Sequence, residues 1–178
     1  MIDATADPQA FNFVASVARR ARSPMIWAEV YAGGIGGFVA RLRPGIEPPP
    51  HAARRQYLAW CRSQGVPWHG QGDDYDAHRE DGPPLIADDA DVGVIAAHTS
   101  RMAIDVLVRC DTSIFPHPAY VIGLAADWVF DEPFDTRPID FSAEGEWQLP
   151  VSGEQAGAAL EYVVSLLDKA DDADRTGT

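Results

Sequence analysis

The chain has 178 residues, of which 46% are hydrophobic and 23% are charged, a composition that excludes a wholly disordered protein. Its formal net charge of -13 would repel a phosphate backbone, so nucleic acid is excluded as the main ligand. No apolar run approaches the roughly 20 residues of a membrane-spanning helix, and the first residues do not resemble a signal peptide, so we expect no membrane contact and a cytoplasmic protein.

The first third of the chain alternates between helical and strand patterns. Residues 8–22 have apolar side chains at helical spacing, with Asp7 at the N-cap position and Pro8 at the first helical position. The apolar, partly β-branched run 25–31 predicts a buried strand, and the alternating run 38–43 predicts a half-exposed one.

The rest of the chain is predicted to hold two further helices before its last strands. A helix over 51–64 presents Tyr57, Leu58 and Cys61 on one side, and residues 67–84 lack periodicity and predict a mobile loop. Residues 89–109 predict the longest helix, which is apolar on both sides and is therefore expected to be buried on two faces. Strand patterns follow at 119–124 and 127–130.

The C-terminal region completes the predicted organisation. An amphipathic helix is expected over 153–169, and a frayed acidic tail over 170–178. The order of strands and helices predicts one α/β domain with a mixed sheet over residues 1–169. The charge is divided along the chain, because residues 1–65 sum to +4 and the remainder to -17.

Three groups of residues invite a functional interpretation. The glycines at 33–37 follow a strand, but no helix follows them as a dinucleotide-binding turn requires, so a closely packed glycine-rich hairpin is favoured. The segment from His69 to Asp81 holds imidazole and carboxylate side chains that could bind a metal, although a solvated loop is favoured. His98 is expected to be a hydrogen-bonded core residue rather than a catalytic one.

Cys61 is the candidate nucleophile. Arg54, Arg55 and Arg62 stand near it in the sequence, and such positive charge lowers the pKa of a thiol. The alternative, which the neighbouring Trp60 supports, is a small buried hydrophobic side chain. With Cys110 as the second of only two cysteines, neither a disulfide framework nor a zinc site is expected.

Several fragments, taken in order, resemble the second half of a ThiF-type adenylyltransferase domain, the fold of the enzymes that activate ubiquitin and its bacterial sulfur-carrier relatives. They span Met1 to Val108 and comprise the Ile2-Asp3-Ala4-Thr5-Ala6-Asp7 run, the helix after it, Pro24 and its strand, Gly36-Gly37-Phe38-Val39, Arg43-Pro44-Gly45 and the long helix from Asp89. The resemblance implies a partial Rossmann-like three-layer domain that lacks the N-terminal nucleotide-binding strands, as though the chain began in mid-domain.

The resemblance also implies a site and partners. Asp3 and Asp7 fall where the family binds its nucleotide and magnesium, although Ala6 replaces the magnesium-side aspartate, and Cys61 falls where the family places its thioester cysteine. No zinc is implied, because the paired Cys-x-x-Cys motifs are absent. ATP and magnesium are expected only with an N-terminal half supplied by a partner, and the protein to be adenylylated would be a ubiquitin-like or sulfur-carrier protein.

Two other functions remain open at this stage. One is a non-catalytic interaction or dimerisation module, which predicts a homo-oligomer. The other is a small metal-dependent hydrolase that uses the segment from His69 to Asp81. An exposed sheet edge, left by the missing strands, is expected to require a partner.

Overall fold

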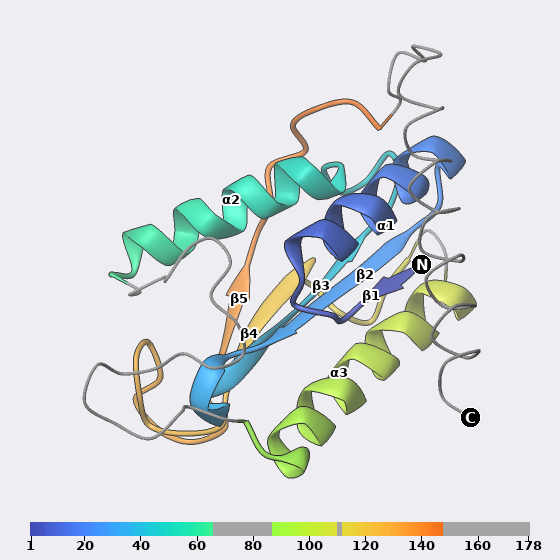
Figure 1. The fold of residues 1–178 in the computed structure, drawn as a ribbon. Helices are drawn as coiled ribbons and strands as arrows, with labels where there is room; N and C mark the ends of the chain where they lie inside the picture. Colours follow the sequence, from blue (N-terminus) through green and yellow to red (C-terminus); the bar gives the residue numbers. More distant parts are fainter. Residues whose placement is uncertain (66–86, 110–111, 148–178) are drawn as a thin grey trace, which may run out of the picture. The chain divides into compact units, whose positions relative to one another are not determined.

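A five-stranded mixed sheet organises the protein, as seen in a computed structural model that describes residues 1–65, 87–109 and 112–147 (Figure 1). Its strands and α-helices are, in chain order, β1 (Ile2–Asp3), α1 (Pro8–Ala21), β2 (Met25–Val30), β3 (Gly36–Leu42), α2 (Pro50–Ser63), α3 (Asp89–Val108), β4 (Ala119–Gly123) and β5 (Thr136–Ile139). The strands lie in the order β1-β2-β3-β4-β5, with β1 parallel to β2 and every other pair antiparallel. The predicted α/β class and mixed sheet are confirmed.

The first parallel pair is made by a β-α-β crossover. The carboxylate of Asp7 accepts a hydrogen bond of 2.6 Å from the backbone N–H of Ala10, and Pro8 begins α1, as the sequence predicts. Helix α1 ends at Arg22, whose left-handed backbone directs its N–H to the last turn. The chain then returns as β2 beside β1, so the carboxyl ends of both strands lie at the same edge of the sheet.

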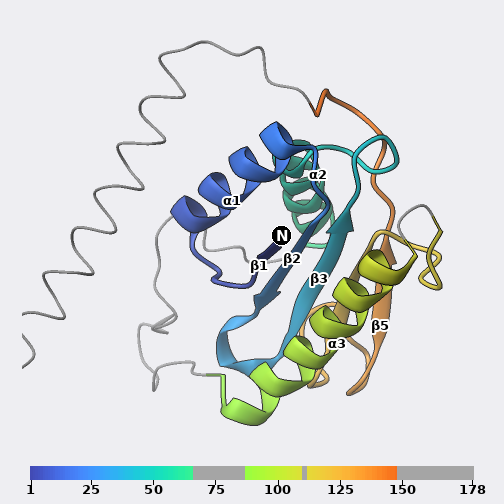
Figure 2. The same ribbon diagram turned by 90° about the vertical axis from the view of Figure 1, so that its right-hand side faces the viewer.

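Helices cover both faces of the sheet. Helices α1 and α2 pack on one face around Trp27, whose ring lies 4.9 Å from that of Phe11 and 5.4 Å from that of Tyr57 between centroids. Helix α3 packs on the other face, where Ile95 and Met102 contact the apolar side chains of β2 and β3. Figure 2 shows this arrangement, with α3 on the opposite side of β2 and β3 from α1 and α2.

The glycine-rich turn between β2 and β3 is closely packed. A short 3-10 turn, Ala32–Gly34, leads into β3 with positive φ at Gly33 and Gly34. A Cβ atom at Gly37 would lie 2.6 Å from Cγ1 of Ile95 and 2.7 Å from the carbonyl oxygen of Glu29. The prediction of a packed glycine hairpin rather than a dinucleotide-binding turn is confirmed, because β3 follows the turn where such a motif needs a helix.

Three predictions about local structure are wrong. Residues 127–130 form turns rather than a strand, because left-handed backbone at Trp128 breaks the extended conformation. Helix α3 is buried on one face alone within the described residues, since its opposite face exposes Ile104 and Leu107. His98 lies on the exposed side of α3 and not in the core.

Other predictions lie outside the described residues. The loop at 67–84, with the segment from His69 to Asp81, the helix at 153–169, the tail at 170–178 and Cys110 all belong to this group. None of the helices within residues 1–65 and 87–109 combines the length and apolarity that a membrane span requires.

Candidate functional site

A tight turn places Asp3 at the carboxyl end of β1. The Asp3 side chain is 2% exposed, and its Oδ1 accepts hydrogen bonds from the backbone N–H of Thr5 at 3.2 Å and from the Thr5 hydroxyl at 2.8 Å. The Thr5 oxygen in turn accepts a hydrogen bond of 3.3 Å from the backbone N–H of Asp7. Oδ2 of Asp3 has no hydrogen-bond partner among the described residues, so the turn fixes the carboxylate and leaves one oxygen for another group.

Glu29 supplies a second carboxyl group near the same edge. Its Oε1 accepts a hydrogen bond of 3.0 Å from the indole N–H of Trp27. Burial raises the pKa of Glu29 to about 7, with a further increase from the negative charge of Asp3, while Arg54 and the Trp27 hydrogen bond oppose the shift. A carboxyl group that titrates near neutrality is a common feature of functional sites.

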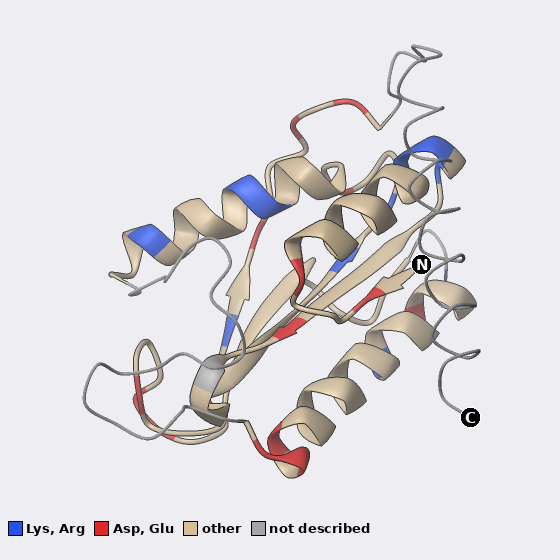
Figure 3. Cartoon of the chain, in the orientation of Figure 1, with Lys and Arg blue, Asp and Glu red and all other residues tan. Residues whose placement is uncertain are grey.

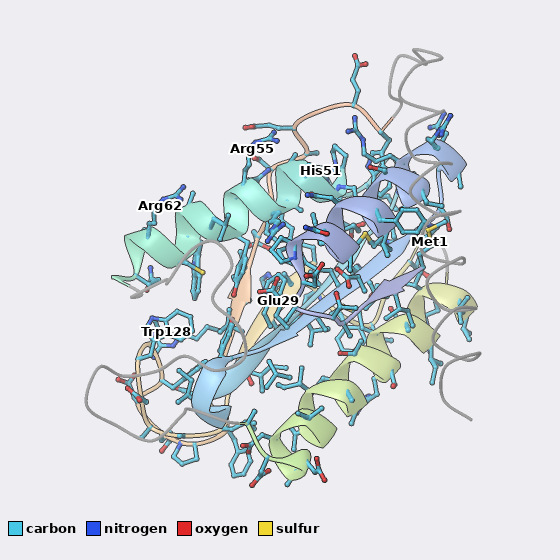
Figure 4. All side chains as sticks on the ribbon, in the orientation of Figure 1. Met1, Glu29, His51, Arg55, Arg62 and Trp128 are labelled. Atoms are coloured by element: carbon cyan, nitrogen blue, oxygen red, sulfur yellow. The ribbon has the colours of Figure 1, made fainter. Side chains whose placement is uncertain are left out.

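The two carboxyl groups lie on one face of the sheet. Asp3 pairs with Trp27 in the parallel register, and Glu29 is two residues further along β2, so the three side chains project to the side covered by α1 and α2. Figure 4 shows Glu29 on that side of β2. Carboxyl ends of parallel strands beside a helix N-terminus are the usual binding position in open α/β sheets.

Positive charge gathers in the helices above this face. Figure 3 shows the basic residues of α1 and α2, while the start of α3 is acidic. The guanidinium of Arg54 lies 4.7 Å from the ring centroid of Phe11. Burial, together with Arg19, Arg54 and Arg55, lowers the pKa of His51, which favours its neutral form. This layer therefore accounts for the positive balance of the first 65 residues.

Cys61 faces the sheet from α2 and is fully buried. Burial raises the pKa of its thiol to about 11, so the expectation that nearby arginines lower it is wrong. Beside it, the hydroxyl groups of Tyr31 and Tyr57 form a buried hydrogen bond of 2.8 Å. An acyl transfer to Cys61 would need α2 to move, and the catalytic role remains a prediction.

A second polar group lies beneath the C-terminal half of α3. Glu47 accepts hydrogen bonds from Arg41 Nε at 3.0 Å and from Arg43 Nη2 at 2.7 Å, and all three residues are buried. Arg41 also binds Ser113, whose hydroxyl reaches the buried carboxylate of Asp105. These bonds join β3 to the chain after α3, which assigns the network a structural role.

Metal-binding capacity is limited in the part of the chain that the structure describes. No cluster of three or more His, Cys, Asp or Glu side chains that could hold an ion occurs there. Magnesium prefers carboxylate oxygens and retains several waters. Asp3, with Glu29 beside it, therefore fits part of a magnesium site, whereas the carboxylate of Asp7 is already engaged as the α1 cap.

Sequence comparison adds no relative to this picture: no family model matches the chain, and no curated protein matches it either. The argument about function therefore depends on the residues themselves. Of the predicted site residues, Asp3 and Asp7 share one turn and Cys61 lies apart in α2. Sequence reasoning missed Glu29, although a lone acid in the apolar run Met25–Val30 was the available signal.

Proposed function

We propose that this chain forms the carrier-facing half of an adenylylation domain similar to the ThiF type. In this proposal a Rossmann-like three-layer domain is completed by an ATP-binding half, which pairs with the open edge of β1 and supplies the phosphate-binding loop. The assembled site would adenylylate the C-terminus of a ubiquitin-like or sulfur-carrier protein in the cytoplasm.

The observation that carries the proposal is the buried carboxylate of Asp3. It lies at the carboxyl end of β1, which pairs with β2 and with no other strand of the described residues. A strand added along the outer edge of β1 would bring its own carboxyl end beside Asp3 if it ran parallel, as strands in nucleotide-binding sheets do. Magnesium bound there would neutralise charge on the ATP phosphates.

Other groups of the chain have defined tasks in this proposal. Asp3 holds the ion through Oδ2, since Thr5 already occupies Oδ1. Arg54 offers positive charge on the same side of the sheet as Glu29, whose pKa is sensitive to it. Attack by the carrier carboxylate on the α-phosphate would release pyrophosphate, and the protein would act by positioning the two anions.

Pyrophosphate exchange tests this proposal. The full chain is purified with the products of the reading frames that flank its gene, and incorporation of labelled pyrophosphate into ATP is measured with each small ubiquitin-like protein among them. Exchange by the wild type, with loss in Asp3→Asn and retention in Asp140→Asn, is expected, because Asp140 is an exposed residue after β5. Absence of exchange in every assembly, or full exchange by Asp3→Asn, contradicts the proposal.

A further inference from the structure

The outer face of α3 is an uncovered apolar surface within the described residues. Its C-terminal half exposes Ile104, Leu107 and Val108 by 59%, 80% and 70%. Its N-terminal half carries small exposed side chains at Ala90 and Gly93. Exposed aliphatic side chains repeated along one helix face are typical of a surface that binds another protein.

The spacing of this face suits packing against another helix. Positions 93, 97, 100, 104 and 107 recur at intervals of four and three residues, which places them along one stripe of the helix. We call this stripe the α3 seam; it consists of Gly93, Ala97, Ser100, Ile104 and Leu107. All five are exposed, whereas Ile95, Met102 and Val106 on the opposite side are buried against the sheet.

We propose that a second copy of this chain covers the α3 seam, with the two α3 helices antiparallel about a twofold axis. The inference is independent of the adenylylation proposal. An antiparallel pair with its centre between residues 98 and 99 sets Gly93 of one copy against Ile104 of the other, and Ala97 against Ser100. Large side chains then meet small ones along the whole seam, which a parallel pair would not achieve.

The charges at the ends of α3 favour the same arrangement. Asp88 caps the N-terminus and Asp89 lies in the first turn, whereas Arg109 ends the helix with its side chain 45% exposed. In the antiparallel pair Asp88 of each copy lies opposite Arg109 of the other. A parallel pair would place the acidic ends together, and it would also align the helix dipoles unfavourably.

Neighbouring structure extends the surface toward β1. A shallow depression borders the seam and is lined mainly by apolar side chains, among them Ala4, Val92 and Ala96. Ile2 is 56% exposed and pairs with Ile26, so it lies on the α3 face of the sheet. The additional area matters because a single pair of 20-residue helices covers less than the roughly 800 Å² per partner of a stable interface.

Sedimentation equilibrium of the full chain tests the proposal. The wild type is expected to approach twice its mass of 19.3 kDa in a concentration series that reaches about 200 µM, a range suited to small interfaces. Leu107→Asp is expected to shift the protein to the monomer without unfolding it, because this side chain is exposed in the single chain. Phe134→Asp is the matched control, since Phe134 is 75% exposed but lies between β4 and β5.

Orientation is tested by cross-linking in a Cys110→Ser background. A mixture of Ala97→Cys and Ser100→Cys proteins is expected to form more disulfide-linked dimer than either protein alone, because antiparallel helices bring these positions together. A monomeric wild type, a dimer unaffected by Leu107→Asp, or equal cross-linking in the three samples overturns the proposal. So does a monomer that dimerises when residues 148–178 are removed, because the tail would then be the occupant of the seam.

Discussion

Replacing Glu29 with Gln should stabilise the protein at alkaline pH. Glu29 is the one described carboxyl group whose pKa is raised toward neutrality, to about 7 from its ordinary value of 4.5. The amide of Gln has a similar shape, keeps an oxygen for the Trp27 N–H and carries no charge at any pH. The substitution therefore removes the cost of burying a carboxylate and retains its hydrogen bond.

The size of the effect follows from the two pKa values. Below pH 4.5 the carboxyl is protonated in the folded and unfolded states, so the group costs nothing. As pH rises toward 7, the unfolded chain loses this proton first and the folded state loses stability relative to it. The gap corresponds to about 3 kcal/mol; because Glu29 is not fully enclosed, we expect the advantage of Glu29→Gln to grow by about 2 kcal/mol from about pH 5 to about pH 8.

Urea unfolding of both proteins at these two pH values measures the effect. The difference in unfolding free energy between variant and wild type isolates Glu29 from the other carboxylates. Glu144→Gln serves as the control, because Glu144 is exposed, and its effect should not change with pH. A Glu29→Gln advantage that is the same at both pH values, or a variant less stable at alkaline pH, would refute the account of a buried carboxyl group.

Three further outcomes are expected. Glu47→Ala should destabilise the fold by about 3–5 kcal/mol in urea unfolding, because it leaves two buried arginines without their carboxylate, whereas Glu144→Ala should cost little. A thiol reagent should label Cys61 slowly in the native protein and rapidly in urea; fast native labelling would show that the site opens. Gly37→Ala should lower the melting temperature, since its Cβ meets an isoleucine of α3 and a backbone oxygen, and an unchanged value would contradict this packing.

Much of the fold could be predicted from local sequence patterns. Asp7 and Pro8 mark the start of α1 because capping and the fixed φ of proline act within a few residues. The apolar run of β2 and the glycines after it predict a buried strand and a packed turn for equally local reasons. The mixed α/β class follows from the order of these elements.

What sequence could not predict depends on contacts between distant parts of the chain. The extent of burial of α3 was overestimated because apolar composition does not show whether a partner covers a helix face. The pKa of Cys61 was misjudged because nearby arginines in sequence point elsewhere, while burial against the sheet dominates. Glu29 gains its importance from Asp3, which is 26 residues earlier and adjacent through strand pairing.

The most direct measurement of the central claim is the magnesium dependence of ATP–pyrophosphate exchange in the assembled protein, compared between wild type and Asp3→Asn. If the carboxylate at the end of β1 holds the ion, the variant should lose at least about tenfold in exchange rate at limiting magnesium. Circular dichroism of both proteins establishes that they are equally folded. Identical magnesium dependence in two equally folded proteins would contradict the assignment of Asp3 and, with it, the proposed function.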